Sequence, residues 1–418
     1  MKKLALSILV GIVALALMVS ACAPAATPTP AAEKPAAESK SAPAAEKPAT
    51  ESKGATPATS SKEAAAASKE PIVIGLVTSV TGGQAATGEN QTAGIKMAIE
   101  EWNQKGGVNG RPIELAVEDD ASNPTGAVNA FNKLISTKKP VAVIGPNYTN
   151  SIMAMEPYIK QAAIPVVTGA NGVPITASGN PWFFRVLTNS AVTSELLVNY
   201  VVNDLGYKKI GIIYINGEYG QSTSKVVQDD LAKLGVTPVR VESYNPDDKD
   251  LTAQLLNLDR AGAEIVIGLS YPPDAGLIMT SVSQLGLKMK LLGNTAFSLP
   301  EALNIAKEAA NGHYLMVEWM PSDDPAIQAW VKKIEARQKQ PANYIDAAYY
   351  DGTNMLLKAI ETAGTDPQAI RKAMLATKGY KGITGEYSFD EHGDGLRQLL
   401  ITQVKDQKLV LVKVVKGQ

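Results

Sequence analysis

The feature that most constrains the fold is a regular alternation of two apolar patterns from residue 72 onward. Short β-branched runs, such as IVIGLVTSV at 72–80, are typical of strands that are buried on both faces. Longer segments between them, such as 90–105 and 222–234, carry their apolar residues at helical spacing. Further strand-like runs occupy residues 113–119, 141–145, 164–168, 209–215, 239–244, 264–270 and 290–294.

Strands that alternate with helices predict parallel sheets covered by helices, which is the α/β class. The runs form two tandem series, one before and one after WFFRVL at 182–187. Two such series predict two doubly wound lobes. In sheets of this kind, ligands bind beyond the carboxyl ends of the strands. Candidate binding residues are therefore expected in the loops that follow each strand.

The N-terminus has the pattern of a cleaved export signal. Two lysines precede an apolar run at 4–19, and two small residues then lead to Cys22, the only cysteine of the chain. Residues 19–22 resemble the bacterial lipobox, which implies cleavage before Cys22 and a diacylglyceryl group on its sulfur. Residues 1–21 are thus expected to be a lipoprotein signal peptide. The alternatives are a transmembrane anchor and a free surface thiol.

A low-complexity segment follows. Residues 23–70 consist almost entirely of Ala, Pro, Glu, Lys, Ser and Thr, and include neither Leu, Ile, Val nor an aromatic residue. A segment with so little apolar surface to bury cannot offset the entropy of ordering its backbone. We therefore expect residues 22–70 to be a disordered linker between the lipid anchor and the folded part.

Composition and motifs argue against several classes of function. The net charge of −1 gives no reason to expect a nucleic acid partner. His313 and His392 stand alone, without other metal ligands at a recognised spacing. The sequence has no G-x-S-x-G elbow, no H-E-x-x-H motif and no dinucleotide fingerprint. We therefore expect neither an enzyme nor a resident cofactor or metal.

The loop after the third predicted strand is the best candidate site that the residues themselves indicate. In GPNYTNS at 145–151, Thr149, Asn150 and Ser151 precede a predicted helix. Hydroxyl groups and free backbone N–H groups then gather at a positive helix end, which suits a carboxylate or another small anion. Simple capping of the helix is the alternative interpretation.

Seven further segments resemble one family when they are taken in order. They are the stretch from GLVTSVTGG to VEDDASNP, then VIGPNYTNS, IPVVTGANG, NPWFFRV, NGEYGQS, SYPPDAG and YDGTNMLLKAIETAG. Together they are similar to the branched-chain-amino-acid-type solute receptors of ABC importers. The similarity extends from about residue 72 to the C-terminus.

The resemblance implies a type I periplasmic-binding-protein fold, with two lobes joined by three crossovers near Arg185, Glu318 and Gly385. The expected N-terminal lobe comprises residues 71–186 and 319–384. The expected C-terminal lobe comprises residues 187–318 and 385–418.

The resemblance also implies a set of ligand contacts: Tyr148, Thr149, Gly169, Ala170, Asn171, Tyr219, Tyr271 and Thr295. Packing in the core is the alternative for Tyr219 and Tyr271. Thr295 departs from the family pattern, because amino-acid receptors place an acid there to pair the ligand ammonium. An unpaired buried ammonium is costly. The departure therefore favours a carboxylate without an ammonium group, or an amide.

The expected function is that of a monomeric extracytoplasmic lipoprotein, anchored to the cell membrane through Cys22. It captures a small carboxylate or amino-acid-like ligand between its lobes and delivers it to ABC permease subunits. The alternative is a sensor of the same fold that reports amides or aromatic acids to a membrane signalling partner. A tethered hydrolase is a third class, which the missing nucleophile disfavours.

Overall fold

The computed structural model describes residues 70–396 and 398–416. The predicted signal peptide, the lipid attachment at Cys22 and nearly all of the predicted linker lie outside these residues. No helix within the described ranges is long and apolar enough to cross a membrane.

The first sheet is parallel and has the strand order β2-β1-β3-β4-β5. Its strands are β1 (Ile72–Thr78), β2 (Ile113–Asp119), β3 (Ala142–Ile144), β4 (Val166–Thr168) and β5 (Phe183–Arg185). The order reverses at β1, which pairs with both β2 and β3. This reversal is the doubly wound arrangement that the alternation predicted.

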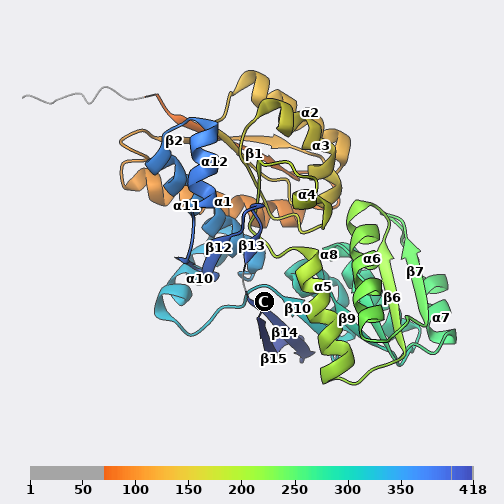
Figure 1. Ribbon diagram of the computed structural model, residues 1–418. Helices are drawn as coiled ribbons and strands as arrows, with labels where there is room; N and C mark the ends of the chain where they lie inside the picture. Colours follow the sequence, from red (N-terminus) through yellow and green to blue (C-terminus); the bar gives the residue numbers. More distant parts are fainter. Residues whose placement is uncertain (1–69, 397, 417–418) are drawn as a thin grey trace, which may run out of the picture. The chain divides into compact units, whose positions relative to one another are not determined.

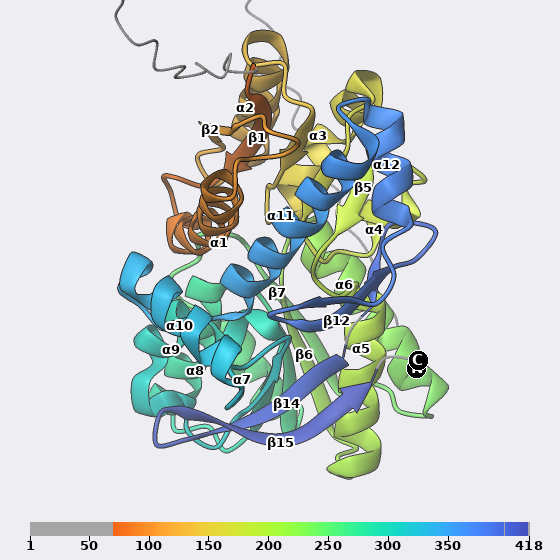
Figure 2. The ribbon, with the colours of Figure 1, turned by 90° about the vertical axis from the view of Figure 1, so that its left-hand side faces the viewer.

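Helices cover both faces of the first sheet, and we call this assembly the first lobe (Figure 1). On one face lie α1 (Ala85–Gln104), α10 (Pro325–Gln338), α11 (Tyr344–Ala363) and α12 (Pro367–Leu375). On the other face lie α2 (Pro124–Thr137), α3 (Thr149–Ala162) and α4 (Pro174–Ala177). Figure 2 shows α11 passing close to α1.

The second sheet has the order β15-β14-β10-β9-β8-β6-β7. Five strands are parallel: β6 (Ile210–Ile215), β7 (Arg240–Tyr244), β8 (Ile265–Leu269), β9 (Lys290–Gly293) and β10 (Tyr314–Val317). The hairpin of β14 (Gln398–Lys405) and β15 (Lys408–Lys416) adds to it in antiparallel fashion. Figure 2 shows this hairpin in dark blue.

Helices also cover both faces of the second sheet, and we call this assembly the second lobe. One face carries α5 (Ser190–Asn199), a π-helical turn at Tyr200–Asp204, and α6 (Glu218–Lys233). The other carries α7 (Thr252–Arg260), α8 (Pro272–Gln284), α9 (Pro300–Ala306) and two short 3₁₀ turns, Thr295–Ser298 and Lys307–Ala310.

Within the described residues, the chain passes from the first sheet to the second after β5, leaves the second sheet after β10, and joins it again at β14. We call these the first, second and third passages. A small antiparallel sheet precedes the third passage, with strands β11 (Tyr380–Gly382), β12 (Gly385–Phe389) and β13 (Gly395–Leu396). Tyr387 and Phe389 of β12 lie in the core of the first lobe, and Leu399 of β14 lies in that of the second. The lobe boundaries given above stay a prediction.

Two helices start earlier than their apolar spacing indicated. The pattern predicted helices at 90–105 and at about 222–234, whereas α1 begins at Ala85 and α6 at Glu218. Their first turns carry small and polar residues, so no apolar stripe marks them. Thr87 and Tyr219 lie on these first turns.

Candidate functional site

A small cavity lies where the strands of the two sheets end, and side chains of both lobes line it. Its volume is about 30 Å³. The lining residues are Thr87, Asn147, Tyr148, Gly169, Asn171, Leu187, Tyr219, Ser270, Tyr271, Pro272, Asn294, Thr295, Ala296, Leu299 and Tyr344. A drug-sized ligand needs roughly 300–1,000 Å³. Side chains therefore fill most of the site in this structure, and a ligand would need the lobes or the side chains to move.

The structure brings most of the residues named from the sequence to this cavity. Six of them line it: Tyr148, Gly169, Asn171, Tyr219, Tyr271 and Thr295. Thr149 and Ala170 are buried beside these residues but are not among the lining residues. The hydroxyl oxygen of Thr149 instead accepts a hydrogen bond from the backbone N–H of Gly172 at 3.1 Å. A ligand contact by any of the eight stays a prediction.

Four tyrosines dominate the cavity, and each stands at the start of a helix. Tyr148 precedes α3, Tyr219 is in the first turn of α6, Tyr271 precedes α8, and Tyr344 begins α11. The rings of Tyr148 and Tyr271 meet edge to face across the lobes, with centroids 4.8 Å apart. Tyr219 stacks on Tyr271 at 5.4 Å. Burial raises the pKa of all four phenols, so they are neutral at physiological pH.

Three of the four helix starts around the cavity lack a cap from the side chain of the preceding residue, whereas α11 has a capping box formed by Asn343 and Asp346. The residues that precede α3, α6 and α8 make no side-chain capping hydrogen bond, although Asn150 Oδ1 accepts from the Tyr219 N–H in the first turn of α6. The first turn of α3 also contains no acidic residue. A helix N-terminus carries partial positive charge and favours anions. This end of the cavity is therefore electrostatically suited to a carboxylate.

Two buried polar side chains hold the lining loops in place. The Tyr349 hydroxyl accepts a hydrogen bond from the backbone N–H of Gly169 at 2.7 Å and donates one to Asn147 Oδ1 at 3.0 Å. The amide of Asn294 donates to the Tyr219 hydroxyl at 2.6 Å and to the Ser270 carbonyl at 3.0 Å. A Cβ atom at Gly169 would lie 2.4 Å from Asn147 Oδ1, so this close approach requires glycine.

None of the described lining residues is charged. Thr295, which the resemblance matches to an acid that would pair a ligand ammonium group, lines the cavity. Two other acids that could pair with an ammonium group accept hydrogen bonds from residues outside the cavity lining. Both oxygens of Glu318 accept hydrogen bonds from the Thr188 N–H at 3.0 Å. Asp346 accepts from the Asn343 N–H and the Gln338 side chain, each at 2.9 Å.

Two carboxyl groups lie just outside the cavity, in the first turns of α8 and α9. Burial raises the pKa of Asp274 to about 6. Burial, together with the nearby Asp274 charge, raises the pKa of Glu301 to about 7. Glu301 Oε2 is buried and forms no hydrogen bond with the described residues. Both shifts favour the protonated, neutral form of these two carboxyl groups beside the cavity.

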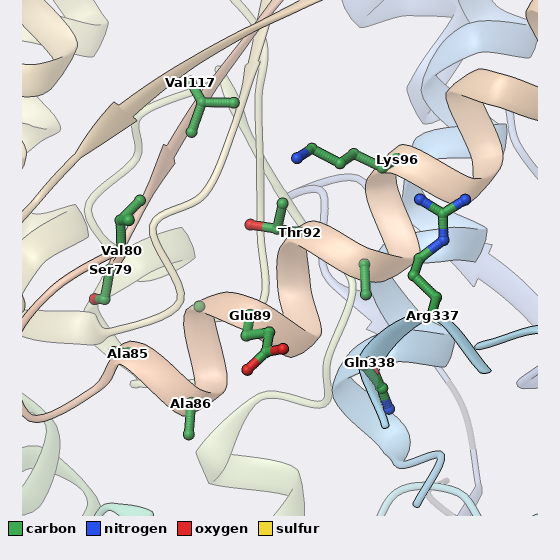
Figure 3. A pocket seen from close by; sticks show the side chains of 12 residues that line it. Ser79, Val80, Ala85, Ala86, Glu89, Thr92, Lys96, Val117, Arg337 and Gln338 are labelled. Carbon is green, nitrogen blue, oxygen red and sulfur yellow. The ribbon is translucent and has the colours of Figure 1, made fainter. Parts of the chain in front are cut away.

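A second hollow lies on the first lobe alone. This groove has a volume of about 780 Å³ and lies between α1, α10 and the ends of β1 and β2. Figure 3 shows Glu89, Thr92 and Lys96 projecting from α1, with Val80 and Val117 opposite. None of the eight residues predicted to bind a ligand lines it. Within the described chain, no group of three or more His, Cys, Asp or Glu side chains could hold a metal ion.

Sequence reasoning missed several lining residues, among them Asn147, Ser270, Asn294 and Tyr344. Asn147, Ser270 and Asn294 directly follow or lie near the ends of β3, β8 and β9, so the rule for parallel sheets could have found them. Tyr344 had no such signal. It comes from a helix that packs on the first sheet after the chain has returned from the second.

Comparisons with known proteins agree with this architecture. A family model described as "Periplasmic binding protein" matches residues 71–408. A leucine-, isoleucine-, valine-, threonine- and alanine-binding protein of Pseudomonas aeruginosa is 28% identical over 326 residues, which cover 78% of this chain and 87% of that protein.

Solved structures with the same arrangement include a leucine-binding protein from Thermotoga maritima. Its TM-score is 0.76 at 25% identity, and the match covers 82% of this chain and 99% of that chain. A solute-binding protein of an ABC transporter from Rhodopseudomonas palustris, in complex with 3,4-dihydroxy benzoic acid, has a TM-score of 0.76 at 22% identity, covering 83% and 98%.

Proposed function

Because the chain belongs to the periplasmic binding protein family and has its type I, two-lobed α/β fold, we propose that it captures a small carboxylate without an ammonium group and delivers it to an ABC permease. Members of this family are extracytoplasmic solute receptors. The finer points of the proposal are the ligand class, the permease, and a lipid anchor at Cys22 that tethers a monomer to the cell membrane.

The observation that carries the proposal is the chemistry of the cavity wall. Uncapped helix starts offer partial positive charge to a carboxylate. The described lining residues offer no carboxylate to an ammonium group, since Thr295 stands where an acid is expected. An ammonium ion that is buried without a partner loses its hydration without compensation. A leucine-like zwitterion is therefore a poorer fit than its deaminated analogue.

The tyrosine rings widen the range of acids that could fit. Four phenols provide apolar faces together with hydroxyl groups that can donate or accept. The Tyr271 hydroxyl is buried and has no hydrogen-bond partner among the described residues. A ring or a short branched chain could pack on these faces while a ligand oxygen pairs with this hydroxyl. Aromatic acids and branched keto acids both meet this description.

The mechanism is closure of two lobes on a ligand. Lining residues come from both lobes, so their full set of contacts exists only when the lobes are closed. A ligand that binds both walls shifts the population toward the closed form by its differential affinity. The closed form would then be the state that the permease recognises.

Calorimetry on the purified chain tests the ligand class. The panel contains leucine, 4-methyl-2-oxopentanoate, 4-hydroxybenzoate and propionamide. Leucine and its keto acid differ chiefly in the ammonium group, so they form a matched pair. We expect the keto acid to bind at least tenfold more tightly than leucine, because the described lining residues offer no carboxylate to the ammonium group of leucine. A preference for leucine over its keto acid would refute the proposed ligand class and restore an amino acid ligand.

A further inference from the structure

Arg185 is the largest side chain that is fully buried, and it lies at the first passage between the sheets. Its guanidinium group faces the loop that follows β4. Nη1 donates to the carbonyl oxygens of Asn171 at 2.7 Å and Gly172 at 3.0 Å. Asn171 lines the cavity. Arg185 therefore holds the backbone of a loop whose other side faces the cavity.

The same guanidinium group is paired with the segment that precedes the third passage. Arg185 Nε lies 2.7 Å from Asp394 Oδ1. Nη2 donates to Thr176 Oγ1 at 3.0 Å, and that hydroxyl donates to Asp394 Oδ2 at 2.9 Å. Backbone contacts reinforce the pair, since the Arg185 N–H donates to the Gly393 carbonyl at 2.8 Å.

The Asp394 carboxylate also reaches the start of the second lobe. Asn189 Nδ2 donates to Asp394 Oδ2 at 2.8 Å, and Asn189 Oδ1 accepts from the Ala191 N–H at the start of α5. Ser190, the first residue of α5, connects this segment back to the cavity loop, because its N–H donates to the Asn171 carbonyl at 2.8 Å. The cavity loop, the first passage and the third passage thus share one charged network.

We propose that Arg185 is a positioning residue that makes the cavity loop at 169–172 and the passages between the sheets move as one unit. A guanidinium group presents its donors in a rigid plane. The Asn171 and Gly172 carbonyls and the Asp394 carboxylate therefore cannot shift independently without breaking either a charge-assisted hydrogen bond or the Arg185–Asp394 ion pair in a largely buried site. A ligand that orders the loop also orders the passages about which the lobes turn.

Lysine cannot replace this arginine, because a single ammonium group cannot reach two carbonyls and a carboxylate in one plane. Asparagine at position 394 keeps the shape of the aspartate but removes the charge. Valine at position 176 is nearly isosteric with threonine and removes only the bridging hydroxyl. The three changes therefore break the same network at three points and with different severity.

Hydrogen exchange of the unliganded full chain, read by mass spectrometry, tests this proposal without any ligand. The variants are Arg185→Lys, Asp394→Asn and Thr176→Val. Arg337→Lys is the control, because Arg337 forms a surface ion pair with Glu100 in the same lobe. We expect exchange to rise about tenfold or more in peptides covering 169–172, 186–191 and 390–395, with α7 unchanged.

The pattern across the variants separates positioning from a general loss of stability. The double variant Arg185→Lys/Asp394→Asn should exchange no faster in these peptides than the faster of the two single variants, because both changes break one network. An equal rise in α7, or faster exchange in only one of the three segments, would overturn the proposal. If Arg185→Lys or Asp394→Asn does not fold, Thr176→Val decides the outcome by the same criterion.

Discussion

Asn150 Oδ1 accepts a hydrogen bond from the backbone N–H of Tyr219 at 3.2 Å, which joins α3 of the first lobe to α6 of the second. The contact is close. A Cβ atom at Gly217 would lie 2.5 Å from Asn150 Nδ2, and Gly217 has φ +125°. Asn150 does not line the cavity, whereas Tyr219 does. The lobes therefore touch directly beside the site.

We expect Asn150→Ala to weaken closure without altering the cavity wall. A neutral hydrogen bond contributes about 0.5–1.5 kcal/mol, or roughly 2- to 10-fold in an equilibrium. Ligand dissociation should accelerate by about that factor while association changes little. Stopped-flow fluorescence with the tightest compound of the panel measures both rates. Asn203→Ala, at an exposed asparagine, is the control. A variant with unchanged dissociation would show that the contact does not stabilise the closed form.

Thr295→Glu should shift the ligand preference toward amino acids. Thr295 lines the cavity, and the resemblance to amino-acid receptors predicts that an acid at this position pairs a ligand ammonium group. A hydrogen bond to a charged group contributes about 1.5–3 kcal/mol, so leucine affinity should rise about 10- to 100-fold in calorimetry. Thr295→Gln has the same size without the charge and is the control. Equal leucine affinity in the two variants would contradict the electrostatic explanation.

Tyr349→Phe should destabilise the chain and loosen two lining loops. It leaves the buried N–H of Gly169 without its partner, which costs about 1–3 kcal/mol. Urea denaturation measures the free energy of unfolding. The neighbouring Tyr350→Phe is the matched control, since its hydroxyl donates to Glu101 in a half-buried position. If the two variants lose similar amounts of unfolding free energy, the hydrogen bonds of Tyr349 with Asn147 and Gly169 do not stabilise the fold more than the Tyr350–Glu101 hydrogen bond does.

Stability should fall as the pH rises from about 5 to 7, and Glu301 should account for part of the fall. Its folded-state pKa is raised to about 7 by burial. The folded protein therefore binds more protons than the unfolded chain between the ordinary glutamate pKa of 4.5 and about 7. Its favourable contribution is fully present below 4.5 and is lost through this window. Glu301→Gln should flatten the melting temperature across that range, whereas the exposed control Glu308→Gln should follow the parent. An unchanged pH profile in Glu301→Gln would refute this assignment.

Cys22→Ser should release the protein from the lipid-anchored fraction. The prediction follows from the lipobox resemblance at 19–22, because the acyl chains would be attached to that sulfur. Metabolic labelling with palmitate checks it, with ligand binding by the purified domain as the control for folding. Labelling that persists in the variant would rule out Cys22 as the attachment point.

The alternation of strand and helix patterns was sufficient to predict the α/β class and eight of the strands between residues 72 and 294, but no strand after residue 294. Strands such as β2 and β6 lie within one residue of the predicted ranges. The reason is clearest for β6, an apolar run that is buried almost throughout. Helix starts were less certain, since α1 and α6 begin with residues that carry no periodic apolar signal.

The sequence by itself determined which segments become strands and that polar loops follow them, because these follow from local patterns of apolar side chains. Only the tertiary structure decided which loops meet. Tyr148, Tyr271 and Tyr344 surround one cavity because three helix starts from distant parts of the chain converge there. Arg185 and Asp394 form a pair because the chain passes between the sheets at two distant points. Such pairings depend on packing between segments that are distant in the sequence, and the local spacing of apolar residues does not encode it.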